Sequence, residues 1–454
     1  IKVFEISSRK VDIQDLLDYF TQDCYFVGYN NHHYDNPVLN YIFSLYRKRY
    51  FEFFSTREIT ESIFRMSQIV IDKNSNFELW KEYKYTKNFL SIDLLTMLFS
   101  KALRVSLKEM QVTMQYKNVE EFVVDWKQDL PEKDMDRLIS YNINDVESTE
   151  ELLYRCEKLL DIRVETERDF GLPCLSLDRV NLGDKLLQLK VMQKSGFTRD
   201  QLENMKSPMD RIDLEKVIFP FIKFNTPVLQ KALQDMKNQH NVSPGRKGYI
   251  NTFIFGGMEV TIGVGGIHGD NGCCSIKCNE DELLLDSDVN SLYPSLIAVY
   301  ELYPPKLKSI LKEVYPEIIQ ERLEFKRTKQ KNKNETYKYM LNGVTGKMQQ
   351  EVSWLYAPFS IMQVRINGQL LLLMLAERLL DLGCKLYQIN TDGILYKIKK
   401  DKYDKLQQVL KEWEELTKLT LETEQFTSFY QLAINDYFGV ESDGNIKKKG
   451  FFLT

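Results

Sequence analysis

The chain lacks the features that mark several common protein classes. Its seven cysteines include a cluster within 273–278, but no second pair and no nearby histidines complete a zinc-binding spacing, so reduced structural thiols are expected. No signal peptide is recognisable, and the most apolar run, 370–376, ends at Glu377 and Arg378 and is too short to span a bilayer. Repeats are also lacking. The sequence therefore predicts a globular protein of the cytoplasm.

The net charge of -4 offers no overall attraction for a polyanion, but the charges are segregated. The stretch 322–347 contains only two acidic residues, Glu324 and Glu335. Its eight basic residues are Arg322, Lys326, Arg327, Lys329, Lys331, Lys333, Lys338 and Lys347. A local basic stripe can neutralise phosphates while an acidic exterior preserves solubility.

A length of 454 residues with 43% hydrophobic residues suggests about three domains. The first part alternates short β-rich runs with helical patterns, and a Gly-rich, β-rich part follows a helical connector. The expected elements are strands at 25–29 and 282–288 and helices at 147–161, 181–238, 315–329, 335–348 and 368–382. Gly383 suits a left-handed C-cap of the last helix.

Two carboxylates follow apolar strands at sharp turns. Asp288 ends one strand and precedes a Pro-containing turn, and Asp392 lies in a Thr-Asp-Gly turn between two others. Asp-Gly is also a common type I′ hairpin turn, so Asp392 alone would be ambiguous. Two such carboxylates brought together could bridge two divalent cations about 4 Å apart, the arrangement used for phosphoryl transfer.

In the sequence between these two carboxylates, a helix is expected that carries one lysine and several small side chains. Lys338 is expected to start it, and Asn342, Gly343 and Gly346 follow on neighbouring turns. Two glycines cost a helix about 1 kcal/mol each, which favours a close-approach role. The preceding segment places four basic residues on one helical face, which alone would fit a solvated surface and here suggests phosphate binding. They are Arg322, Lys326, Lys329 and Lys333.

These segments resemble the motifs of family B DNA polymerases, especially those of bacteriophages, and the resemblance covers nearly the whole chain. DVNSLYPS (288–295) is similar to motif A, KYMLNGVTG (338–346) to motif B and INTDGI (389–394) to motif C. The resemblance implies two Mg²⁺ ions, or Mn²⁺, held by Asp288, Asp392 and the Val289 carbonyl, with Lys338 as a catalytic contact to the triphosphate.

The resemblance also implies a set of binding residues. Tyr293 would stack on the sugar and exclude ribonucleotides. The other nucleotide-binding residues would be Ser291, Leu292, Arg322, Lys326, Asn342 and Gly343. Those contacting DNA would be Gly265, Gly266, Lys447, Lys448 and Lys449.

Four positions depart from the family pattern. Asn390 replaces the first aspartate of motif C, which leaves Asp392 as the essential member. Gly393 and Gly343 replace serines, and Thr345 replaces the motif B tyrosine, which implies a weaker check of the nascent base pair. Only 50 residues separate Asp288 from Lys338, which leaves no room for the insertion of protein-primed relatives. Priming from an ordinary 3′-hydroxyl is expected.

Upstream, GYNNHHYD and YNIND resemble the second and third motifs of the family's 3′-5′ proofreading exonuclease. Asn31, Asp35, Tyr141 and Asp145 match them, and the resemblance implies that Asp35 and Asp145 bind metal. Taken singly, these residues could equally be a helix cap and an amphipathic surface. The family's first motif, D-x-E, does not occur before Asp35. Proofreading is therefore expected only if residues before Ile1 supply it, and both chain ends are expected to be truncated.

The resulting expectation is an α/β and α+β multidomain protein. It would have an RNase H-like exonuclease domain (1–180), a helical connector (181–245), a right-hand polymerase with an RRM-like palm (246–308 and 349–454) and short helical fingers (309–348). The thumb would be missing.

The expected substrates are primer-template DNA and dNTPs, without a membrane. Candidate partners are a phage single-strand binding protein, a helicase or a processivity factor, and the location would be the host cytoplasm. The alternatives are a polymerase-derived nucleic-acid-binding protein without catalysis and a nuclease-dominant enzyme.

Overall fold

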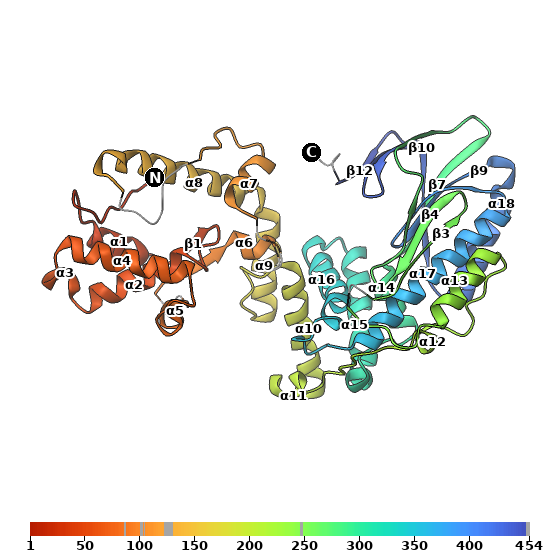
Figure 1. The fold of residues 1–454 in the computed structure, drawn as a ribbon, viewed down its shortest axis with the longest axis horizontal. Helices are drawn as coiled ribbons and strands as arrows, with labels where there is room; N and C mark the ends of the chain where they lie inside the picture. Colours follow the sequence, from red (N-terminus) through yellow and green to blue (C-terminus); the bar gives the residue numbers. More distant parts are fainter. Residues whose placement is uncertain (86–87, 100–102, 104, 122–129, 246–247, 451–454) are drawn as a thin grey trace. The chain divides into compact units, whose positions relative to one another are not determined.

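The computed structural model describes residues 1–85, 88–99, 103, 105–121, 130–245 and 248–450. Within it the chain divides into two compact units, each described by itself below. Unit 1 comprises Ile1–Leu182 and Lys329–Thr336, and unit 2 comprises Gly183–Thr328 and Tyr337–Thr454. Both units mix helices and strands, which confirms the expected α/β character at this level (Figure 1).

Unit 1 is mainly helical and contains a short parallel ladder. β1 (Tyr25–Gly28) pairs with β2 (Leu90–Asp93), which places Gly28 opposite Asp93. Parallel strands require a long crossover, and α2 to α5 supply it here. The helices are α1 (Ile13–Phe20), α2 (Asp35–Arg47), α3 (Tyr50–Phe53), α4 (Thr56–Ile71), α5 (Phe77–Tyr83), α6 (Leu94–Leu98), α7 (Leu107–Thr113), α8 (Met135–Arg155) and α9 (Glu157–Phe170). The helix expected at 147–161 is therefore divided at the buried Cys156.

Unit 2 is built on an antiparallel sheet. Its main path runs β12-β11-β10-β7-β9-β8-β5-β4-β3, and β6 pairs with β10 beside it. The strands are β3 (Ile250–Phe255), β4 (Met258–Gly263), β5 (His268–Asp270), β6 (Cys274–Lys277), β7 (Glu282–Val289), β8 (Lys385–Asn390), β9 (Gly393–Lys399), β10 (Leu421–Ala433), β11 (Asp436–Glu441) and β12 (Ile446–Lys449). The neighbouring strands β8 and β9 are the most enclosed, which suits a rigid base for functional groups.

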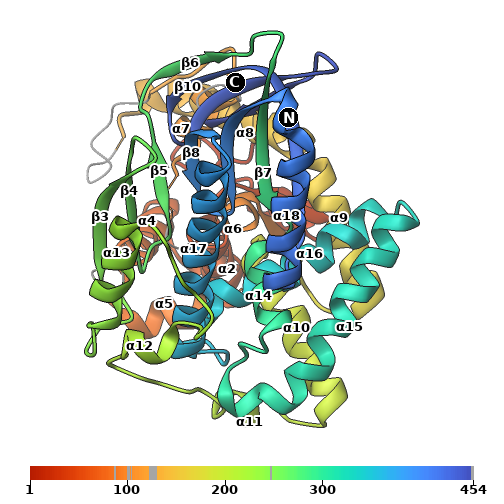
Figure 2. The same cartoon turned by 90° about the vertical axis from the view of Figure 1, so that its right-hand side faces the viewer.

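Two long helices cover one face of this sheet (Figure 2). α17 (Pro358–Asp381) and α18 (Tyr403–Thr417) run side by side, and the Trp413 indole N–H donates to the Leu371 carbonyl at 2.9 Å. α17 is long and apolar enough to cross a membrane, but 83% of its most apolar window is buried in the protein, as in the core helix of a soluble protein.

The remaining helices flank this layer. They are α10 (Arg179–Ser195), α11 (Arg199–Glu203), α12 (Leu214–Val217), α13 (Pro227–Lys237), α14 (Leu292–Val299), α15 (Lys308–Arg327) and α16 (Lys331–Met348), of which α10 and α16 continue across the boundary between the units.

Three helix starts differ from expectation. α15 begins at Lys308, and Pro316 lies inside it although proline removes a helical hydrogen bond. Burial of Leu311, Val314 and Ile318 on one face explains why the helix persists. α16 begins at Lys331, so Lys338 lies inside the helix and does not start it.

The long α17 starts ten residues earlier than expected, at Pro358, where proline is tolerated in the first turn. Its C-terminus agrees with expectation, because Gly383 has a φ of +90° just beyond it.

Candidate active site

Strand pairing brings Asp288 and Asp392 together at one end of the unit 2 sheet. Asp288, near the end of β7, lies opposite Gly393, the first residue of β9. Asp392 immediately precedes Gly393, and its carbonyl accepts a hydrogen bond from the Val289 N–H at 2.8 Å. Two carboxylates far apart in sequence are thereby fixed on adjacent central strands.

The turn that carries Asp392 is not the type I′ Asp-Gly turn that was the alternative interpretation of this segment. Asn390 pairs with Gly393, so the two central residues are Thr391 and Asp392. Thr391 has a φ of 54°, and its N–H is anchored by the Ile267 carbonyl at 3.1 Å. A left-handed β-branched residue is strained, and so is Ser291 at φ 51°, three residues after Asp288. Strain of this kind concentrates at functional sites.

Gly393 leaves room for the carboxylates. A Cβ at this position would lie 1.7 Å from Oδ1 of Asp288 and 3.5 Å from Oδ1 of Asp286. Asp286 and Asp288 therefore share one face of β7, as residues two apart in a strand do. The departure from serine to glycine in motif C has a steric reason in this chain.

The pKa values of both carboxylates are raised. Burial raises the pKa of Asp288 despite the attraction of Lys447, and burial together with the negative charge of Asp288 raises that of Asp392. Close carboxylates of this kind attract a divalent cation, which relieves their repulsion. Their oxygen atoms and the Val289 carbonyl are hard donors, which fits Mg²⁺ or Mn²⁺.

The turn after Asp288 and α15 supply further groups nearby. Nη1 of Arg322 lies 3.5 Å from Oγ of Ser291, so the structure brings these two predicted residues together. Burial raises the pKa of Tyr293, Arg365 lowers it, and the negative charge of Asp392 raises it. Leu292 is buried in the core, whereas Lys326 is exposed in the last turn of α15.

The predicted face of α16 is only partly formed. Asn342 is exposed, but Gly343 is buried and faces the protein. Gly346 has open space beside it, as close approach of a ligand would require. Lys333 belongs to unit 1, where it forms an ion pair with Asp169 at 3.5 Å. The basic face expected over Arg322 to Lys333 is therefore divided between the units.

The Gly-rich loop between β4 and β5 is anchored from α17. Gln369 holds Gly263 through both its backbone groups, at 2.9 and 2.8 Å. Within the loop Gly265 is exposed, and Gly266 has a φ of +132° that favours glycine. The two predicted DNA-contacting glycines thus lie on a loop with a defined conformation.

Asn390, at the first aspartate position of motif C, has a structural role. Its Nδ2 donates to the Ile434 carbonyl at 3.1 Å and to Asn435 Oδ1 at 3.2 Å, and the residue is buried. An amide can donate these bonds, which an ionised carboxylate could not. The substitution therefore ties the β8 end to the β10-β11 turn.

The three lysines of β12 have different environments. Lys447 Nζ lies 2.6 Å from Glu424, 3.5 Å from Asp286 and 3.7 Å from Asp288. Lys448 is exposed, and Lys449 lies over the Tyr437 ring at 5.6 Å. The expected role of these three lysines in gripping DNA stays a prediction, and in this structure the charge of Lys447 is directed at carboxylates.

In unit 1 a buried aspartate shapes the loop of the second exonuclease-like motif. Asp93 is fully buried and accepts hydrogen bonds from the N–H groups of Asn30 at 2.9 Å and His32 at 3.1 Å. Asn31 is buried and donates to Ser91 Oγ at 2.9 Å, so it helps to hold this loop. Loss of hydration around the carboxylate raises the pKa of Asp35 to about 6, and the charge of Asp93 adds to the effect.

The third exonuclease-like motif lies on α8, as expected. Asp145 is ion-paired with Lys108 at 2.6 Å and accepts from Gln111 at 3.1 Å. The same ammonium lies 4.4 Å from the centre of the Tyr141 ring. Asp145 and Tyr141 thus share a lysine partner, whereas Asp35 lies in the field of Asp93.

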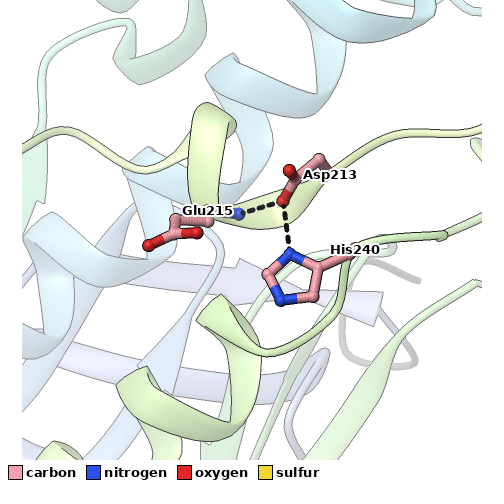
Figure 3. Close-up of side chains that lie close together, drawn as sticks. All are labelled: Asp213, Glu215 and His240. Carbon is pink, nitrogen blue, oxygen red and sulfur yellow. Dashed lines mark hydrogen bonds and ion pairs between the residues drawn. The ribbon is translucent and has the colours of Figure 1, made fainter.

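One further group of possible metal ligands consists of Asp213, Glu215 and His240 (Figure 3). Asp213 Oδ1 accepts from the Glu215 N–H at 3.1 Å and lies 3.0 Å from Nδ1 of His240. His240 lowers the pKa of Asp213. Asp213 is the N-cap of α12, and this capping role accounts for the arrangement.

Sequence reasoning missed Asp286, Glu424, Asp93 and Lys108. The period of two along a strand signals that Asp286 shares a face with Asp288. Glu424 pairs with Asp286 across the β7-β10 ladder. No local pattern indicates a partner 138 positions away, so only the structure reveals this acidic group.

Comparisons with known proteins give a distant likeness. No family model and no curated protein matches the chain. Among solved structures it is similar to the family B DNA polymerase from the hyperthermophilic archaeon Pyrobaculum calidifontis, with a TM-score of 0.49 and 15% sequence identity. The likeness covers 99% of this chain and 55% of that polymerase, so the chain spans about half its length. At this TM-score the case for function depends on the site itself.

Proposed function

We propose that unit 2 is the catalytic part of a DNA-templated DNA polymerase of phage family B type, which extends a primer 3′-hydroxyl with dNTPs. The observation that carries the proposal is the pairing of Asp288 with the Asp392 turn at the end of the central strands. Its support is that motifs A and C, recognised independently in the sequence, meet at this point.

In this proposal Asp288, Asp392 and the Val289 carbonyl hold two Mg²⁺ ions. The ions supply activation of the attacking oxygen and neutralisation of the triphosphate. Tyr293, beside the acidic pair, supports the incoming sugar. Arg322, next to Ser291, neutralises phosphate charge, and Lys338 contacts the triphosphate from α16.

The test is primer extension on a primed DNA template with Mg²⁺. Asp288→Ala and Asp392→Ala are each expected to reduce the rate at least 100-fold, an order of magnitude typical of losing a group that stabilises transition-state charge. Asp404→Ala, at an exposed position in the first turn of α18, is the matched control and should extend normally.

Equal rates in all four proteins would refute the proposed site. A folded wild-type chain that binds primer-template but extends nothing would favour the alternative of a non-catalytic nucleic-acid-binding protein. Circular dichroism of each variant confirms that a lost rate is not caused by unfolding.

Unit 1 is proposed to be an RNase H-like exonuclease domain, on the basis of the Asp35 and Asp145 motifs. Proposed domain limits are those expected from the sequence, with the fingers at 309–348 between the two palm segments.

A further inference from the structure

The acidic end of the unit 2 sheet carries more negative charge than the proposed metal pair requires. Asp286 and Glu424 face each other across the β7-β10 ladder, directly beside Asp288. The Asp286 side chain is only 13% exposed, whereas that of Asp288 is 39% exposed. An enclosed carboxylate without a cationic partner is strongly destabilising, so Asp286 needs one within the protein.

Lys447 supplies that partner from β12. Its ammonium is closest to Glu424 at 2.6 Å, and more distant from Asp286 at 3.5 Å and Asp288 at 3.7 Å. Its Nζ lies over the Phe426 ring, 5.9 Å from the ring centre, and the side chain is 30% exposed. Packing and three carboxylates therefore fix the position of this charge.

We propose that Lys447 is a built-in counter-cation for Asp286 and Glu424, which reserves the more exposed Asp288 for divalent metal. It is a positioning residue of the active site, and it does not serve as a contact to duplex DNA. The inference deepens the proposed polymerase function, on which it rests.

The geometry explains why the lysine matters. Without its charge, Asp286 and Glu424 lose the lysine that lies between them, whereas Lys449 still acts on Asp288. A divalent cation would then bind among these carboxylates in competition with the position beside Asp392. Metal would then bind, but away from the productive site. Lys447 prevents this because an ammonium already occupies the space between the three carboxylates.

The test compares wild type, Lys447→Met, Asp286→Asn and the double variant. In EDTA, Lys447→Met should lower Tm by several degrees, and addition of Mn²⁺ should raise Tm more in this variant than in wild type. The Mg²⁺ concentration for half-maximal primer extension should increase at least fivefold. In the double variant, Asp286→Asn should restore most of the lost Tm and metal response, because the excess charge is removed together with its partner.

Lys397→Met is the matched control. Lys397 lies on β9 in the same sheet and forms an ion pair with Glu282 at 2.8 Å, with side-chain exposures of 19% and 21%. Its loss should lower Tm without changing the response to Mn²⁺. This control separates the loss of any half-enclosed ion pair from an effect at the metal site.

The proposal is overturned if Lys447→Met leaves the response to Mn²⁺ at the wild-type value, or if Asp286→Asn fails to rescue it. Weakened DNA binding in Lys447→Met with an unchanged metal response would instead restore the duplex-gripping role. If the wild-type chain extends no primer, the proposed function fails, yet Tm and the Mn²⁺ response still decide the role of Lys447.

Discussion

The pKa of Asp286 is raised by its surroundings in the folded protein. Burial and the charge of Asp288 raise its pKa to about 7, although Lys447 acts in the opposite direction. The folded state therefore binds a proton that the unfolded chain, with a carboxyl pKa of about 3.9, has already released. Stability should consequently fall as pH rises from about 4 to 7.

Replacing the Asp286 carboxylate should remove this fall in stability with rising pH. Asp286→Asn should increase the free energy of unfolding by roughly 4 kcal/mol at pH 8 in EDTA, and by little at pH 4. Urea denaturation at the two pH values measures the difference. An equal effect at both would show that Asp286 is ionised in the folded protein at low pH.

At the residue scale, the sequence indicates which side chains carry the proposed chemistry but not which residues surround them. Asp288 and Asp392 could be chosen from motif and turn chemistry, because both signals are local. The roles of Lys447 and Asn390 could not, because each depends on partners that come from separate strands. The family resemblance implied a DNA contact for Lys447, and the pairing of both β10 and β12 with β11 brings Glu424 and Lys447 together.

At the scale of elements, α17 organises unit 2 through buried polar side chains. Asn367 accepts from the Phe219 N–H at 2.7 Å, and Glu377 accepts from the Thr226 N–H at 2.6 Å. Gln369 holds the Gly-rich loop after β4. An apolar helix thus fixes the connector and the loop with a few directed bonds.

Removing one of these hydrogen bonds should lower the free energy of unfolding. Gln369→Leu removes the buried partner of the Gly263 N–H and leaves the Gly263 carbonyl with only the Gly266 N–H at 3.3 Å, so it should lower the free energy of unfolding by about 1–3 kcal/mol. Urea denaturation measures this. Leu373→Met, a volume-conserving change on the same buried helix, should cost less than about 1.5 kcal/mol. Similar losses in both variants would contradict a special role for the amide.

Sequence patterns located the elements better than their ends. The strand at 282–288 and the hairpin of helices were expected from apolar periodicity and a polar turn. The start of α15 was expected at 315 but lies at Lys308, because buried residues on one face carry the helix through Pro316. Strand order could not be inferred, since β10 pairs with β7 across more than a hundred residues.

At the scale of the whole molecule, the two units differ in how complete their carboxylate sets are. Unit 2 contains both members of the proposed metal pair, on adjacent strands. In unit 1, Asp145 is neutralised by Lys108, and Asp35 lies near Asp93, which is already used by backbone N–H groups of its loop. The sequence ahead of Asp35 contains no D-x-E.

Because Lys108 neutralises Asp145 and Asp93 is held by its own loop, we expect the proposed primer extension to exceed any degradation of single-stranded DNA. The measurement is incubation of end-labelled single-stranded DNA with Mn²⁺ and no dNTPs, beside primer extension by the same preparation. Asp35→Ala and Asp145→Ala should change neither result, because two carboxylates with separate partners cannot assemble a two-metal site. Degradation lost in Asp35→Ala but retained in Asp392→Ala would show that unit 1 finds its remaining metal ligands within this chain, and Asp93 would be the first to replace.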